Sequence, residues 1–180
     1  FAIILWGPVA TMRLLAEEQQ LGTLELLMTT PIREWEIVLG KFVAVLAMFM
    51  GIVVPTLVYV GLIAWFGSPD VGPLFTGYLG LVLYGAAAAS LGLFTSSLSS
   101  NQIIAGATSA VALLFLTLAD QAAAVVAGTP SAVLRSLSLP GHYNDLVAGV
   151  VELSDLAYFI TFIAFFLLMA TLSLETRRWR

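Results

Sequence analysis

Four long runs of apolar residues constrain the fold of this chain more than any other feature of its sequence. They cover residues of about 42–66, 74–98, 103–127 and 155–174. A helix needs roughly 20 apolar residues to cross the hydrocarbon core of a bilayer. Lipid cannot hydrogen-bond to the backbone, and the alternating pattern of a membrane β-barrel is absent, so helices are expected. The runs predict an all-α, polytopic membrane protein with four complete spans.

The composition agrees with that class. Hydrophobic residues make up 60% of the chain and charged residues only 10%, and the mean hydropathy is +1.01. A soluble domain carries a much larger share of charged residues. The chain has no cysteine, which excludes disulfides and thiolate metal sites. Nothing in the sequence indicates a nucleic-acid partner.

The apolar residues before the first complete span predict part of a further helix. Residues 1–15 are too few to cross a bilayer alone, so we expect them to be the end of a fifth span that begins upstream. Because the chain starts at Phe1 inside this run, we expect an N-terminally truncated piece of a longer protein. Within the first complete span, Pro55 is expected to kink the helix, since proline has no backbone N–H.

The basic residues favour one orientation in the membrane. Alternating spans bring six of the seven Lys and Arg residues to the side of the C-terminal tail, as the positive-inside rule requires of the cytoplasmic side. These six residues are Arg13, Arg33, Lys41, Arg177, Arg178 and Arg180. Arg135 alone falls on the opposite side. We therefore expect a cytoplasmic C-terminus, a cytoplasmic segment 16–41 and an external helical segment 128–154.

The polar segment 16–41 separates the partial span from the first complete one. Arg13 and Glu17 stand four residues apart, as in an ion pair on the surface of a helix that leaves the membrane. Gly22 is a typical left-handed terminator for that helix, and Thr23 is a good N-cap for a new turn. Pro31 then suits the first position of the next helix.

Between these signals lies a short amphipathic stretch. Leu24, Leu27 and Met28 form a small apolar face, with Glu25 beside it. The pattern predicts a short helix that lies crosswise between two membrane helices. An interfacial helix resting on lipid headgroups is the alternative, but its glutamates would be repelled by an anionic leaflet. We therefore expect these apolar side chains to bind a protein on the cytoplasmic side.

Residues 17–41, with the sequence EEQQLGTLELLMTTPIREWEIVLGK, resemble the cytoplasmic coupling segment of type-2 ABC transporter permeases. An acidic helix end, a Gly-Thr-x-Glu step, a proline and a Gly-Lys pair carry the resemblance. Residues 141–178 are similar to the end of the gliding-motility-type branch, whose named role is not carried over. The resemblance implies a single permease domain over residues 1–180 of an ABC-type exporter in a bacterial or archaeal inner membrane. It also implies a dimer that docks on cytosolic ATPase subunits.

The resemblance further implies roles for individual residues. Residues 22–28 would form the coupling helix, Glu17 and Glu18 the cytoplasmic gate end, and Lys41 the anchor of the next span. The residues implied in ATPase coupling are Glu17, Glu18, Gly22, Thr23, Glu25, Leu26, Leu27, Pro31 and Lys41. The chain has no Walker-type GxxxxGK(S/T) motif. We therefore expect a subunit that is not an enzyme and binds no cofactor, with ATP and Mg²⁺ held by its partner.

Small residues crowd the second complete span. Gly85, Ala89 and Gly92 permit close helix approach, either inside one subunit or at a dimer or substrate-path face. Four serines near the end of the span are expected to satisfy one another's hydrogen bonds. They are Ser96, Ser97, Ser99 and Ser100.

Asp120 lies in the outer half of the third complete span. A carboxylate inside a membrane is costly enough to be a functional candidate, here for the transport pathway. The alternative is that the span ends early and Asp120 lies level with the outer headgroups, where it costs little. Both interpretations stay open.

Residues 128–154 are too apolar for a free external loop. Thr129 and Pro130 are expected to open one short helix, and a second helix is expected to carry an apolar stripe. The stripe consists of Tyr143, Leu146, Val147 and Val150. The resemblance implies that these helices are re-entrant. His142, the one histidine, is expected to form an outer-surface hydrogen bond rather than a metal site.

Three other classes of membrane protein compete with a permease. A membrane-embedded enzyme would need a nucleophile and a base, or two facing aspartates, at one depth. A transporter driven by an ion gradient would show inverted repeats and paired intramembrane charges, whereas Asp120 stands alone. A non-transporting membrane scaffold is the third alternative.

Overall fold

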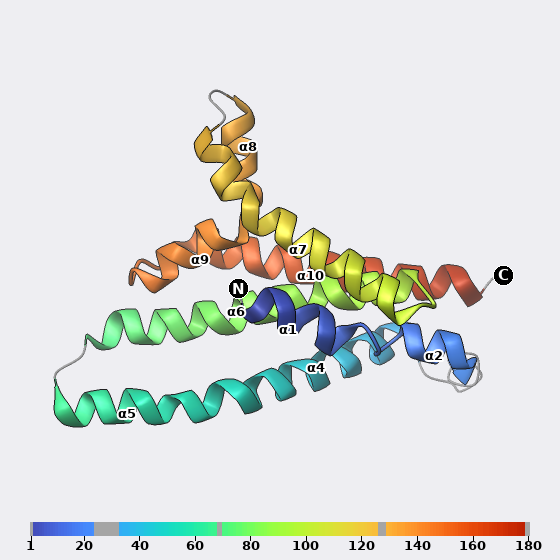
Figure 1. Cartoon of the computed structure of the whole chain (residues 1–180), viewed down its shortest axis with the longest axis horizontal. Helices are drawn as coiled ribbons and strands as arrows, with labels where there is room; N and C mark the ends of the chain where they lie inside the picture. The colour runs from blue at the N-terminus through green and yellow to red at the C-terminus, as the bar shows by residue number, and fades with distance from the viewer. Residues whose placement is uncertain (1, 24–32, 68–69, 126–128, 179–180) are drawn as a thin grey trace.

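The computed structural model describes residues 2–23, 33–67, 70–125 and 129–178, and most of these residues are helical (Figure 1). The elements in chain order are α1 (Ala2–Thr11), α2 (Ala16–Leu21), α4 (Glu34–Val53), the 3-10 helix η1 (Val54–Thr56), α5 (Leu57–Phe66), α6 (Val71–Leu98), α7 (Gln102–Val125), α8 (Thr129–Leu137), α9 (Leu139–Val147) and α10 (Leu153–Arg178).

Four helical segments are long and apolar enough to cross a membrane, which confirms the polytopic helical class. They are Glu34–Phe66, Val71–Leu98, Gln102–Val125 and Leu153–Thr176. The first begins earlier than the apolar run at about residue 42 suggested. Its opening turns carry Glu34, Glu36 and Lys41, so the helix extends beyond its apolar part into a polar region.

Helix α6 is the centre of the bundle and contacts α1, α4, α7, α9 and α10 (Figure 1). Almost every residue from Tyr84 to Ser97 is buried. Alanine, glycine and serine predominate in this stretch, and their small side chains let several helices approach one axis. The small-residue run therefore serves packing within one chain.

Two glycines of α6 lie against side chains of other helices. A Cβ atom built on Gly92 would lie 2.0 Å from Oγ1 of Thr11 in α1. One built on Gly85 would lie 2.4 Å from the ring of Phe49 in α4. The expectation that Gly85 and Gly92 permit close approach is confirmed, and Ala89 between them is fully buried.

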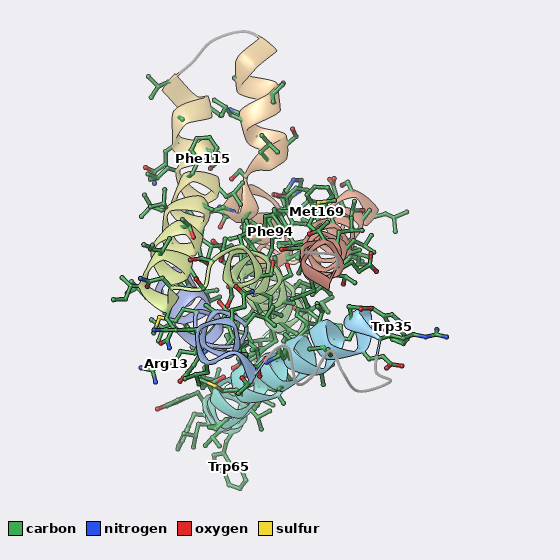
Figure 2. The ribbon with its side chains drawn as sticks, turned by 90° about the vertical axis from the view of Figure 1, so that its right-hand side faces the viewer. Arg13, Trp35, Trp65, Phe94, Phe115 and Met169 are labelled. Atoms are coloured by element: carbon green, nitrogen blue, oxygen red, sulfur yellow. The ribbon has the colours of Figure 1, made fainter. Side chains whose placement is uncertain are left out.

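The first span changes helix type at Pro55, where the sequence predicts a kink. Helix α4 ends at Val53, a 3-10 turn contains Pro55, and α5 follows. Thr56 Oγ1 donates to the carbonyl of Val53 at 2.6 Å and lies 3.0 Å from the hydroxyl of Tyr78 on α6. No residue of α5 is buried within the chain, and Trp65 points away from the bundle (Figure 2).

Two short helices, α8 and α9, follow α7, and α8 projects away from the bundle at the top of Figure 1. Helix α8 begins at Thr129 as predicted and lies beside α7. Ser138 caps α9, since its Oγ accepts from the N–H of Gly141 at 3.2 Å. The fully buried Leu139 and Leu146 attach α9 to the core.

The predicted apolar stripe on this second helix is only half right. Tyr143 and Leu146 face the bundle, but Val147 and Val150 are exposed. The helix ends at Val147 because Gly149 adopts a left-handed conformation with a φ of 85°. Val150 therefore lies outside the helix and does not continue its face.

A buried polar contact joins α9 to α10. Nδ1 of His142 lies 2.7 Å from Oδ1 of Asp155, whose side chain is only 3% exposed. The His142 ring also stacks on Tyr158 with centroids 4.1 Å apart, and the Tyr158 hydroxyl donates to the carbonyl of Leu137 at 2.8 Å. The expected hydrogen bond of His142 is present, and its partner is the first-turn carboxylate of a membrane helix.

Gly92→Ala should lower the unfolding temperature of the detergent-solubilised protein, because the added methyl group would displace Thr11. Over-packing of this kind costs about 1–3 kcal/mol. Gly77→Ala is the matched control, since Gly77 lies on the same helix with open space at its Cβ position. Alanine stabilises a helix over glycine by about 1 kcal/mol. Equal shifts of the two variants in thermal circular dichroism would contradict the tight contact between α1 and α6.

Asp155→Ala should destabilise the protein by about 1–3 kcal/mol, because His142 would lose its partner in a buried position. Asp155→Asn keeps an acceptor and should lose less. Glu152→Ala is the control, since Glu152 is an exposed acid three residues away. Urea unfolding in detergent measures the difference. A loss in Asp155→Ala no larger than in the control would show that the contact does not hold α9.

Candidate coupling site and outer cavity

The polar segment begins with an interruption of the first helix, which the sequence did not predict. Helix α1 ends at Thr11 and α2 begins at Ala16, with a turn over residues 12–15 between them. The expected ion pair between Arg13 and Glu17 is wrong. The N–H of Glu17 donates to the carbonyl of Arg13 at 3.3 Å, but Arg13 is exposed in the turn, and no side-chain contact joins the two residues in the described structure. Arg13 instead points outward (Figure 2).

One serine of α6 satisfies the backbone of this interruption. Oγ of Ser96 accepts from the N–H groups of Leu15 at 3.1 Å and Ala16 at 3.0 Å, and it donates to the carbonyl of Met12 at 3.2 Å. Ser96, Leu15 and Ala16 are all fully buried. Unpaired backbone groups in such a place would cost several kcal/mol. The Ser96 hydroxyl therefore replaces the helical hydrogen bonds that the interruption removes.

The serines do not satisfy one another, so that expectation is wrong. Ser97 Oγ donates to the carbonyl of Phe94 at 2.7 Å, and Ser99 Oγ lies 3.3 Å from the carbonyl of Asn101. The carbonyl of Ser97 accepts from Gln19 Nε2 at 3.0 Å and from Ser173 Oγ at 3.3 Å. Helical geometry directs these hydroxyls to backbone carbonyls and to neighbouring helices.

Lys41 connects the two ends of the polar segment. Its Nζ lies 2.6 Å from Oε1 of Glu18 on α2, and it also donates to the carbonyl of Leu14 in the interruption. The side chains of Lys41 and Glu18 are 16% and 29% exposed. The ammonium group thus satisfies a backbone carbonyl of the turn and a carboxylate at once. We call Lys41, Glu18, the turn 12–15 and Ser96 the elbow.

The other residues implied in ATPase coupling are only partly described. Gly22 ends α2 in a left-handed conformation with a φ of 70°, as predicted. Thr23 is exposed, and its Oγ1 lies 3.4 Å from the carbonyl of Glu18. Glu17 is half-buried. The remaining implied residues, Glu25, Leu26, Leu27 and Pro31, lie outside the described residues, as does most of the predicted coupling helix.

A cavity of about 440 Å³ lies where α1, α6, α7 and α9 meet. Its lining residues are Ala2, Ile3, Leu81, Tyr84, Thr117, Asp120, Gln121, Pro140, Tyr143 and Asn144. Asp120 is half-buried in this wall. Its carboxylate has no hydrogen bond or ion pair with any residue in the described ranges.

Aromatic rings and a hydroxyl lie near the carboxylate in the same wall. The hydroxyl of Tyr84 is 3.2 Å from Oγ1 of Thr117, and the rings of Tyr84 and Tyr143 meet edge to face with centroids 5.6 Å apart. Burial raises the pKa of the Tyr143 phenol above its usual value of 10, so this phenol stays neutral near pH 7. Across the described ranges, no cluster of three His, Cys, Asp or Glu residues could hold a metal ion.

The sequence indicated Asp120, Glu18 and Lys41 as separate candidates. It did not indicate that Lys41 contacts Glu18 and the carbonyl of Leu14, or that Asp120 lines a cavity. The serine run of α6 was the visible signal for the capping role of Ser96, but its partner in α1 could not be read from the chain. Asp155 gave no signal, because an acid at a helix start is ordinary.

The chain matches the family model described as ABC-2 family transporter protein over residues 1–178. It is also similar to the protein called "Probable multidrug ABC transporter permease YbhR" from Escherichia coli strain K12 and from Escherichia coli O157:H7, with 34% identity over 94 residues in each. The aligned stretch covers 52% of this chain and 25% of each relative. No solved structure matches the chain. The extent of the family match, together with the four helices of the described residues that are long and apolar enough to cross a membrane, shows that the chain belongs to the ABC-2 transporter family as a multi-pass membrane subunit.

Proposed function

We propose that this chain is the permease subunit of an ABC-type exporter, which couples ATP hydrolysis by a separate cytosolic ATPase to the movement of substrate across the membrane. The observation that carries the proposal is the contact of Lys41 with both Glu18 and the carbonyl of Leu14. It ties the two ends of the polar segment 16–41 together at one end of a membrane bundle. Membership of the ABC-2 family supports the same function.

The elbow is suited to transmit a displacement. Helix α2 is held at its start by Ser96 and through Gln19 to the carbonyl of Ser97. Helix α4 is held to α2 and to the turn through Lys41. A force on the connection between α2 and α4 would therefore reach α1, α4 and α6 together. Packed helices respond to such forces by moving as rigid bodies between discrete arrangements.

The expected orientation follows from which end of the bundle carries the elbow. Helix α2 and the C-terminus lie at the same end of the molecule (Figure 1). The alternation of the spans assigns six of the seven basic residues to the side of the membrane that carries the C-terminus. By the positive-inside rule, this end would face the cytoplasm. The resemblance to ABC-type exporters would place the protein in a bacterial or archaeal inner membrane. The ATPase would dock there, on residues 22–28.

The catalytic chemistry would belong to the partner. The chain has no GxxxxGK(S/T) motif, so ATP and Mg²⁺ would bind to the ATPase subunit and no cofactor would bind to this chain. A second permease copy or a paralogue would complete the pathway, and two ATPases would drive it. The proposal predicts that the full-length protein retains a cytosolic ATPase during purification, and that the bound permease changes the rate at which this ATPase hydrolyses ATP. A full-length protein that never retains one would favour a secondary transporter or a scaffold.

Exchange of the charges in the elbow tests whether it transmits the displacement. Glu18→Lys and Lys41→Glu should each reduce permease-dependent ATPase stimulation roughly tenfold, because like charges would face each other in a partly buried site. The double exchange should restore part of the activity. Gln20→Lys is the matched control, since Gln20 is exposed on the same short helix. Reconstituted complexes provide the ATPase rates. If the double variant stimulates the ATPase no more than the less active single variant does, this pair does not act in coupling.

A substitution in the implied coupling helix tests where the ATPase docks. Leu27→Asp should weaken association with the ATPase roughly tenfold or more, because it places a charge in an apolar contact. Leu21→Asp is the control, since Leu21 is exposed at the end of α2 and outside residues 22–28. Binding is measured by co-purification and titration, with thermal unfolding as the folding check. Undiminished ATPase association in Leu27→Asp would place the docking site elsewhere.

A further inference from the structure

The cavity lined by α1, α6, α7 and α9 contains a carboxylate that the elbow does not use. Asp120 lies on α7, inside a segment that is apolar enough to span a membrane. Its carboxylate meets no cation in the described structure. A charged group at such a position is costly unless a partner compensates it. The space in front of Asp120 is not filled by any of the described residues.

The lining of the cavity defines the charge of that partner. None of its ten residues is basic, and Asp120 is the only acid among them. The other polar groups are the phenols of Tyr84 and Tyr143, the hydroxyl of Thr117 and the amides of Gln121 and Asn144. The cavity therefore carries one negative charge among neutral groups. An anion would meet uncompensated repulsion there, whereas a single positive charge would be neutralised.

The remaining walls define the body of the partner. Ala2, Ile3, Leu81 and Pro140 contribute apolar surface, and the tyrosine rings add aromatic surface that attracts cations at its faces. The volume of about 440 Å³ falls within the range of about 300–1,000 Å³ typical of pockets for drug-sized molecules. A small inorganic cation would need several oxygen ligands and would leave the apolar walls unfilled.

We propose that this cavity binds a monovalent organic cation with an apolar body, its charge against Asp120 and its body against Tyr84, Tyr143 and the aliphatic wall. The identification of this ligand as a transported substrate rests on the proposed export function, but its binding does not. Helices α1, α6, α7 and α9 all contribute to the cavity. Because α1 and α6 also meet at the elbow, movement of the elbow would reshape the wall around the ligand.

A second cavity provides an internal comparison. It has a volume of about 560 Å³, lies between α7, α10 and the end of α8, and contains no charged residue. Its wall includes Phe162, Phe165 and Phe166. A ligand there meets apolar and aromatic surface but no carboxylate. Binding at this second cavity should not respond to Asp120.

Equilibrium dialysis of the full-length permease with its ATPase in nanodiscs of zwitterionic lipid tests the proposal. Tetraphenylphosphonium is the cationic probe, and tetraphenylborate is the anion of nearly the same shape. Saturable binding of the cation should weaken roughly tenfold to a hundredfold in Asp120→Asn, which removes the charge at constant shape. Asp145→Asn is the matched control, since Asp145 is an exposed acid on α9 that does not line the cavity. Tetraphenylborate should show no saturable binding that depends on Asp120.

A second variant keeps the test decisive if Asp120→Asn does not fold. Gln121→Lys changes an exposed position on the cavity wall and should also weaken cation binding, since it adds a positive charge beside Asp120. Cation binding that is unchanged in the folded variants, or equal saturable binding of the anion, overturns the proposed ligand class while ATPase coupling is unaffected. Asp120-dependent cation binding by a permease that never engages an ATPase overturns the export function and leaves the site in place.

Discussion

The hydrogen bonds of Ser96 to the interrupted first helix are the interaction on which the rest of this structure depends. A helix that ends inside a membrane protein exposes backbone N–H and carbonyl groups that lipid cannot satisfy. One hydroxyl accepts from two of these N–H groups and donates to a carbonyl, and the Lys41 ammonium donates to another carbonyl. The chain can therefore leave the direction of α1 at residue 12 and place α2 against the end of α6.

The same constraint explains why α6 is so rich in small residues. Ser96 can reach the turn only if α1 packs closely on α6, and Gly92 permits this by leaving space for Thr11. Gly85 does the same for Phe49 of α4. The elbow and the cavity thus belong to one tightly packed group of helices, since α6 contributes to both and the turn of the elbow follows directly on α1. Close packing of this kind transmits displacement instead of absorbing it.

Local signals predicted the parts of the structure that depend on local chemistry. The apolar runs indicated the spans because their length alone satisfies the bilayer. Pro55 indicated a distortion where α4 ends, because proline lacks a backbone N–H, and Gly22 indicated the end of α2, because glycine readily adopts the left-handed conformation. The prediction failed for Arg13 and Glu17, because Arg13 lies in the turn over residues 12–15 with its side chain exposed. It failed again for Val150, which Gly149 separates from the helix.

The sequence by itself determined the class, the number of complete spans and the position of the polar segment, because hydrophobic periodicity and backbone restrictions act over a few residues. Only the tertiary structure decided which polar groups meet. Ser96 lies 81 positions from Leu15, and Lys41 lies 27 positions from Leu14, so no local pattern links them. The cavity beside Asp120 likewise depends on tertiary packing, because α1, α6 and α9 contribute its other walls. Contacts between distant segments follow from how helices pack, and that packing depends on the shapes of all their faces together.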